Sequence, residues 1–96
     1  MRAYEMMLIY SPQLDEEALE AAIQRTKDLI ANNGGEVEKA DKWGRRRFAY
    51  EIDDMTEGFY VVMDFKAESG ATAEVERVLK ITEEVVRYLL VRKDEE

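Results

Sequence analysis

Residues 39–50 read KADKWGRRRFAY, and they decide the fold because a basic segment here runs directly into an apolar alternation. Every second position after the arginines carries a large apolar side chain: Phe48, Tyr50 and Ile52. This period of two predicts a strand with one buried face. Gly44 lies inside the stretch, where glycine often marks a bulge or a bend. We therefore predict one long, bent strand, or two pieces of one, over residues 36–53.

The basic charge of this stretch has two interpretations. The chain has a net charge of −8, yet this segment holds a cluster of lysines and arginines around the only tryptophan, Trp43. Such a cluster is typical of surfaces that grip nucleic acid. Lysine and arginine also protect exposed sheet edges from pairing with other chains. Trp43 could stack on a partner, cover the end of the helix layer or fill a bend in the strand. The buried position in the bend is favoured for a lone tryptophan.

The composition bounds the class of protein. With 96 residues, of which 46% are hydrophobic and 38% charged, the chain fits one globular domain. It has no cysteine and no histidine, so disulfides, thiolate chemistry and the commonest general base are excluded. No apolar run approaches the ~20 residues of a membrane span. Glu5 interrupts the N-terminal run that would otherwise suggest a signal peptide, so we expect a cytoplasmic protein.

The apolar patterns outside residues 39–50 predict the other elements. Strands are expected at residues 2–10, 59–67 and 85–93, and helices at residues 16–33 and 71–80. Asp15 is a good N-cap for the first helix, and Asn33 with Gly34 should end it. Residues 53–58 form a polar turn, which makes the two flanking strands a hairpin.

The order strand, helix, strand, strand, helix, strand predicts an α+β fold of the ferredoxin-like split βαβ type (βαββαβ). Right-handed crossovers place both helices on one face of a four-stranded antiparallel sheet. One domain should cover residues 1–93, with residues 94–96 as a frayed acidic tail. Within the bent strand, we expect Arg46 to lean over the helix side or to bend out at the Gly44 kink, and Arg45 and Arg47 to lie on the open side, available to a partner or RNA.

The sheet face opposite the helices is expected to be apolar. It should present Met7, Ile9, Tyr60, Val62, Leu89 and Val91. Such a patch is too apolar to stay in water, which indicates a protein partner or bases stacked on the aromatic side chain. A homodimer through the same face is the alternative, because closed dimers are the commonest oligomers.

The sequence carries no constellation typical of an enzyme. It contains no P-loop and no G-x-G-x-x-G motif. Asp53, Asp54 and Glu57 lack the ligand spacing of a calcium loop and favour an ordinary acidic turn over a metal site. We therefore expect no enzyme, no metal, no cofactor and no small-molecule substrate.

An RNA-recognition module of the RRM type shares the predicted topology. Its RNP1 motif would fall on residues 57–64, EGFYVVMD. Gly58, Phe59 and Val62 fit the motif, but Val61 and Asp64 stand where aromatic side chains should stack on bases. This module remains an alternative function, as does a homodimeric ferredoxin-like ligand-binding protein.

Several segments of the chain form one recognisable pattern. They are residues 1–5 (MRAYE), 34–39 (GGEVEK), 41–52 (DKWGRRRFAYEI), 58–60 (GFY) and 85–93 (VVRYLLVRK). In these motifs the chain resembles the family of bacterial small-subunit ribosomal protein six. The resemblance covers essentially the whole chain, and W-G-x-R-x-[LF]-A-Y-x-I at residues 43–52 is its specific part.

The resemblance implies a structural role in the ribosome. Members of that family bind the central domain of small-subunit ribosomal RNA as a pair with small-subunit ribosomal protein eighteen, a smaller, basic protein. A basic partner would explain an acidic chain at an RNA site, because the partner supplies phosphate affinity. The interface with this partner is expected at Met7, Tyr60, Val62, Leu89 and Val91.

The resemblance also directs attention to the cations at the ends of the first and last strands. These strands are neighbours in a sheet of order 4-1-3-2, so we predict that their cations cluster and contact phosphate. The predicted cluster consists of Arg2, Arg87, Arg92 and Lys93. Arg45 and Arg47, on the open side of the bent strand, complete the expected RNA contacts.

Overall fold

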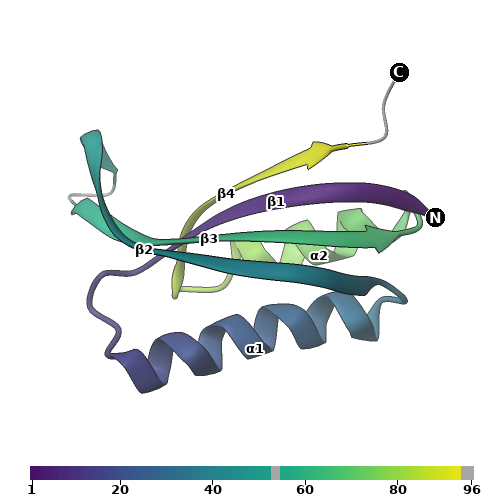
Figure 1. Ribbon diagram of the computed structural model, residues 1–96, viewed down its shortest axis with the longest axis horizontal. Coiled ribbons are helices and arrows are strands. Elements are labelled where there is room, and N and C mark those ends of the chain that lie inside the picture. The colour runs from purple at the N-terminus through teal and green to yellow at the C-terminus, as the bar shows by residue number, and fades with distance from the viewer. Residues whose placement is uncertain (53–54, 94–96) are drawn as a thin grey trace.

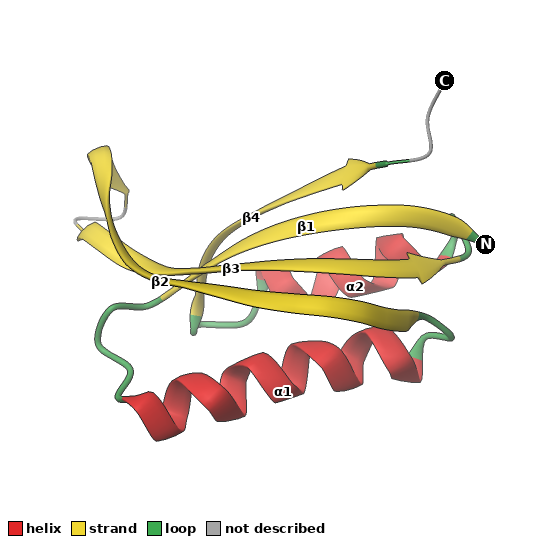
Figure 2. Ribbon diagram, in the orientation of Figure 1, coloured by secondary structure: helices red, strands yellow, loops and turns green. Residues whose placement is uncertain are grey.

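The structure, a computed structural model, describes residues 1–52 and 55–93. Its elements are β1 (Arg2–Tyr10), α1 (Glu16–Asn32), β2 (Glu36–Ile52), β3 (Met55–Ala67), α2 (Ala71–Lys80) and β4 (Val85–Arg92). The strands form one antiparallel sheet in the order β2-β3-β1-β4, and both helices cover the same face of it (Figure 1). The predicted ferredoxin-like fold is confirmed, and Figure 2 separates its helix layer from its sheet layer.

The core lies between the sheet and the helices. β1 and β3 occupy the centre of the sheet, and their alternate side chains are buried towards the helices: Tyr4, Met6, Leu8, Tyr10, Val61, Met63, Phe65 and Ala67. The helices contribute Leu19, Ala22, Ile23, Ile30, Val75 and Leu79. Each large apolar side chain buried in this way stabilises the fold by roughly 1.5–3 kcal/mol. The opposite sheet face receives no helix.

Helix α1 begins and ends where the sequence indicates. The Oδ1 of Asp15 accepts a hydrogen bond of 2.7 Å from the backbone N–H of Ala18, which caps the first turn. Gly34 follows the last turn with a φ of 85°, a conformation that glycine adopts without strain. A Cβ added at Gly35 would lie 2.6 Å from Cγ2 of Ile30. The backbone that follows the helix therefore passes too close to Ile30 for any residue larger than glycine.

β2 contains a β-bulge at Trp43. Lys42 pairs with Val61 and Gly44 pairs with Tyr60, so Trp43 is an extra residue without a partner position on β3. Gly44 has a φ of 87°, a left-handed conformation that glycine adopts without strain and that accommodates the bulge. The irregularity predicted at Gly44 is therefore confirmed.

The hairpin formed by β2 and β3 is longer than predicted. Residues 55–58, assigned to a turn from their polarity, belong to β3, and Arg47 pairs with Glu57. The turn prediction was wrong because the paired strands extend beyond both helices (Figure 1), where pairing requires no buried apolar face. Residues 53–54 of the predicted turn, with the two aspartates weighed as metal ligands, and the predicted tail at residues 94–96 lie outside the described residues.

Candidate functional site

The open sheet face is assembled from cross-strand rows that run over β3, β1 and β4. Each row holds one residue from each strand: Tyr60–Ile9–Arg87, Val62–Met7–Leu89 and Asp64–Glu5–Val91. Side chains of directly paired residues point to the same face of a sheet. The predicted apolar residues, called the apolar set below, therefore lie on one face of the sheet: Met7, Ile9, Tyr60, Val62, Leu89 and Val91. Leu89 and Val91 extend this set to the β4 edge of the sheet.

Exposure is concentrated on β4. Leu89 is 59% exposed and Val91 is 45% exposed, whereas Ile9 in the middle of the sheet is only 7% exposed. The other members of the set are half-buried: Met7, Tyr60 and Val62. A shallow pocket of about 230 Å³ lies between Met7, Ile9 and Leu89. Contiguous exposed apolar side chains of this kind are typical of protein interfaces.

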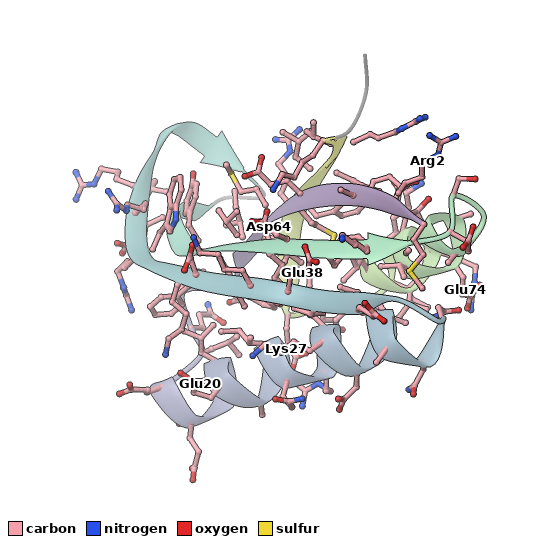
Figure 3. All side chains as sticks on the ribbon, turned by 45° about the vertical axis from the view of Figure 1, so that its right-hand side comes forward. Arg2, Glu20, Lys27, Glu38, Asp64 and Glu74 are labelled. Atoms are coloured by element: carbon pink, nitrogen blue, oxygen red, sulfur yellow. The ribbon has the colours of Figure 1, made fainter. Side chains whose placement is uncertain are left out.

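An acidic pair borders the apolar set. Asp64 lies on the side of β3 that faces away from α1 (Figure 3), directly opposite Glu5 of β1. Its Oδ1 is buried and, among the described residues, has no hydrogen-bond partner, while its Oδ2 lies 3.4 Å from Nζ of Lys93. A buried carboxylate oxygen without a partner is costly. The pair was not predicted from the sequence, although both residues alternate in phase with the apolar set.

Three of the predicted phosphate contacts lie at one end of the β1–β4 pair. Arg92 pairs with Tyr4, and the backbone N–H of Lys93 donates to the carbonyl oxygen of Ala3 at 2.8 Å. Both cations therefore lie near Arg2, which extends from the N-terminal end of β1 (Figure 3). The three cations therefore lie at the same end of the sheet, and their contact with phosphate stays a prediction.

Arg87 does not belong to this cluster. It pairs with Ile9, at the C-terminal end of β1, because the start of an antiparallel neighbour meets the end of the first strand. At ~3.3 Å per residue, about 17 Å of strand separates it from Arg92. The prediction that all four cations gather at one place was wrong for Arg87.

The bulge reverses the predicted faces of the hairpin arginines. Arg45 pairs with Phe59 and its guanidinium lies 5.0 Å from the centre of that ring, which packs against the core. Arg45 therefore lies on the helix side, Arg47 shares its face, and Arg46 lies on the open side. Without the bulge, alternation from Lys42 would have put Arg46 on the helix side; one extra residue exchanges the faces. The predicted placement of Arg45 and Arg47 was wrong, and Arg46 does not lean over the helix side, the first of its two predicted placements.

Trp43 is exposed rather than buried in the bend. Its side chain is 48% exposed, so the prediction of a core position was wrong. The guanidinium of Arg46 lies 5.9 Å from the centre of the indole ring, and its Nε donates to the carbonyl oxygen of Trp43 at 3.3 Å. Next to the bulge, Lys42 forms an ion pair with Glu20 of α1, and this hydrogen bond raises the pKa of the Lys42 ammonium.

The predicted RNA contacts differ in their acidic neighbours. Arg45 forms an ion pair with Glu57 at 3.2 Å, and Lys93 forms one with Asp64 at 3.4 Å. Among the described side chains, no carboxylate pairs with the exposed guanidiniums of Arg2, Arg46, Arg47 and Arg87. These four side chains have charge that is available to an anionic ligand.

The described part of the chain contains no cluster of three or more acidic side chains that could hold a metal ion. Neither of its helices is long and apolar enough to cross a membrane.

Comparison with known proteins agrees with this architecture. Residues 3–92 match the family described as ribosomal protein S6. A protein of Carboxydothermus hydrogenoformans named small ribosomal subunit protein bS6 is 50% identical over 98% of this chain and 98% of its own length. The protein of the same name from Thermoanaerobacter pseudethanolicus is 52% identical over 99% of this chain and 100% of its own length.

A solved structure supports the same relationship. The crystal structure of 30S ribosomal protein S6 from Thermotoga maritima superimposes with a TM-score of 0.92 at 34% identity, over 96% of this chain and 87% of that chain. The resemblance predicted from the sequence motifs is confirmed, as is the predicted location in the small ribosomal subunit. The chain belongs to the ribosomal protein S6 family of small-subunit ribosomal proteins.

Proposed function

We propose that the chain is a structural, non-catalytic protein that binds small-subunit ribosomal RNA as a pair with small-subunit ribosomal protein eighteen. The observation that carries the pairing is the open sheet face, where Leu89 and Val91 are exposed beside Met7 and Val62. Covering these side chains removes apolar surface from water, which contributes about 25 cal/mol per Å². We expect Met7, Tyr60, Val62, Leu89 and Val91 to contact the partner.

Charge favours a basic partner over a second copy of this chain. The net charge is −8, and Glu5 and Asp64 border the apolar set on the open face. In a homodimer through this face, the acidic pairs of two copies would repel each other, with Lys93 offsetting part of the charge of Asp64. A cationic side chain of a basic protein would instead add attraction and supply a donor for the buried Oδ1 of Asp64.

The RNA contacts follow from the positions of the cations. Arg2, Arg92 and Lys93 form one contact at the first end of the β1–β4 pair, and Arg87 forms a second one at the other end. On the hairpin, Arg47 is a stronger candidate for phosphate than Arg45, because Arg45 already pairs with Glu57. The basic partner supplies further phosphate affinity that this acidic chain lacks.

Three measurements test this proposal. Gel filtration of the chain mixed with purified protein eighteen should give a one-to-one complex, and the complex should bind central-domain ribosomal RNA with an affinity that falls steeply with salt. Tagged chain expressed in cells should co-purify with small ribosomal subunits at low salt. A stable homodimer that ignores protein eighteen would contradict the pairing, and salt-independent binding would contradict the phosphate contacts.

A further inference from the structure

A pocket of about 400 Å³ lies beside the exposed ring of Trp43, where α1 begins beneath the bulge. Leu19, Phe59 and Val61 give it an apolar floor, while Glu16 and Lys42 lie at its rim. This volume falls within the range of small-ligand sites, roughly 300–1,000 Å³. An exposed tryptophan that walls an apolar pocket offers a flat surface for stacking.

The charges around the pocket are arranged in two zones. At the rim, Lys42 is neutralised by Glu20, and the Glu16 carboxylate repels anions. Along the strand from the ring, the guanidinium of Arg46 lies 5.9 Å from the centre of the indole, and Arg46 and Arg47 have no carboxylate partner among the described side chains. An anionic group is therefore disfavoured beside Glu16 and favoured beside these two arginines.

A nucleotide has the matching separation of an apolar ring from a charged phosphate. Stacking on aromatic rings with arginine nearby is the usual way in which proteins hold single-stranded bases. A base within a duplex cannot enter such a pocket, whereas an unpaired base of a loop or bulge can. We propose that Trp43 stacks on one unpaired RNA base in this pocket, and that Arg46 and Arg47 hold the flanking phosphates.

This inference rests on the proposed function and adds a contact that lies on the β2–β3 hairpin, apart from the cations of β1 and β4. Arg45 has a positioning role in it. Its guanidinium covers the ring of Phe59, pairs with Glu57 and donates to the carbonyl oxygen of Pro12 at 3.2 Å, which fixes the strand beside the pocket.

The fluorescence of Trp43 provides a direct test, because it is the only tryptophan of the chain. The chain paired with protein eighteen is titrated with central-domain ribosomal RNA, and the same pair carrying Trp43→Phe gives the signal to subtract. A stacked base should quench the Trp43 emission as RNA binds. Trp43→Ala should weaken the Kd about 5- to 100-fold, the equivalent of one lost stack. Arg46→Ala combined with Arg47→Ala should lower the salt slope of binding by about 1–2.

Lys80→Ala, which removes an exposed cation at the end of α2, is the matched control and should bind like the unaltered pair. If RNA binds but Trp43 emission and the Trp43→Ala affinity stay unchanged, the inference is wrong while the proposed function stands. Quenching by protein eighteen before RNA is added would assign the pocket to the protein partner and overturn the inference. If no RNA binds to any pair, both the inference and the proposed RNA binding fail.

Discussion

The hydroxyl of Tyr10 lies 2.7 Å from Oγ1 of Thr26, inside the core where the end of β1 meets α1. Burial raises the pKa of Tyr10 to about 12. An unfolded tyrosine titrates near 10, so the contribution of this group is fully present below pH ~10 and is lost as pH rises through ~12. We expect the free energy of unfolding to fall by about 3 kcal/mol from this group alone.

Urea unfolding between pH 8 and 12, read by circular dichroism, measures this loss, and Tyr10→Phe is its control. The variant should be about 1 kcal/mol less stable at neutral pH, because it lacks the hydrogen bond. It should also lack the alkaline component, so the stability curve of the unaltered chain should fall to that of the variant and cross below it between about pH 10 and 12. Curves that stay parallel up to pH 12 would show that folding does not raise the pKa of Tyr10.

Leu89→Asp should strongly weaken the proposed pairing with protein eighteen while leaving the fold intact. Leu89 is 59% exposed on the edge strand β4, so its replacement leaves little apolar burial in the free chain to lose. At an interface centre, such a change typically costs at least ~2 kcal/mol, a Kd about 30-fold weaker. Ile81→Asp is the matched control, because Ile81 is 72% exposed at the end of α2, away from the open face. Equal binding by both variants in calorimetry would place the interface elsewhere.

Arg87 should act independently of Arg2 and Arg92 in RNA binding. Its separation from the other two cations along β4 predicts free-energy losses that add within ~0.5 kcal/mol when Arg87→Ala is combined with Arg2→Ala. Each phosphate contact removed should lower the salt slope by about 1. Filter binding of the protein pair over a salt series gives both quantities. Strong non-additivity would contradict the independence of the two contacts.

Gly44→Ala should destabilise the chain by about 1–2 kcal/mol, the cost of a left-handed conformation for a residue with a Cβ. Gly44 has a φ of 87°, and a Cβ there would contact no atom within 4 Å, so strain alone sets the cost. Gly70→Ala is the matched control, because its φ of −72° suits any residue and its Cβ would also meet open space. Denaturant titration compares the two variants, and equal stabilities would contradict the strain.

The elements and their order could be predicted because local patterns decide them. The period-two strands, the Asp15 cap and the Gly34 exit each depend on a few neighbouring residues, and each is found as expected. The shared face of the apolar set also followed, since it needs only alternation and the order of strands.

Register could not be predicted from the same patterns. Gly44 indicated an irregularity, but only the pairing of Lys42 with Val61 and Gly44 with Tyr60 shows which residue is extra. That extra residue decides the faces of the arginines and the exposure of Trp43. The position of Arg87, in contrast, could have been predicted. Antiparallel pairing with β1 already places the start of β4 beside the C-terminal end of β1.

β1 precedes the other described strands in the sequence, yet it lies inside the sheet, with β3 on one side and β4 on the other. Both of its neighbours come from the second half of the chain, so the sheet depends on contacts between distant parts of the sequence. Such contacts form slowly, because the intervening loop must close first. During translation, the face made by Met7 and Leu89 exists only once residue 92 has left the exit tunnel. A nascent chain that lacks β4 therefore cannot present that face.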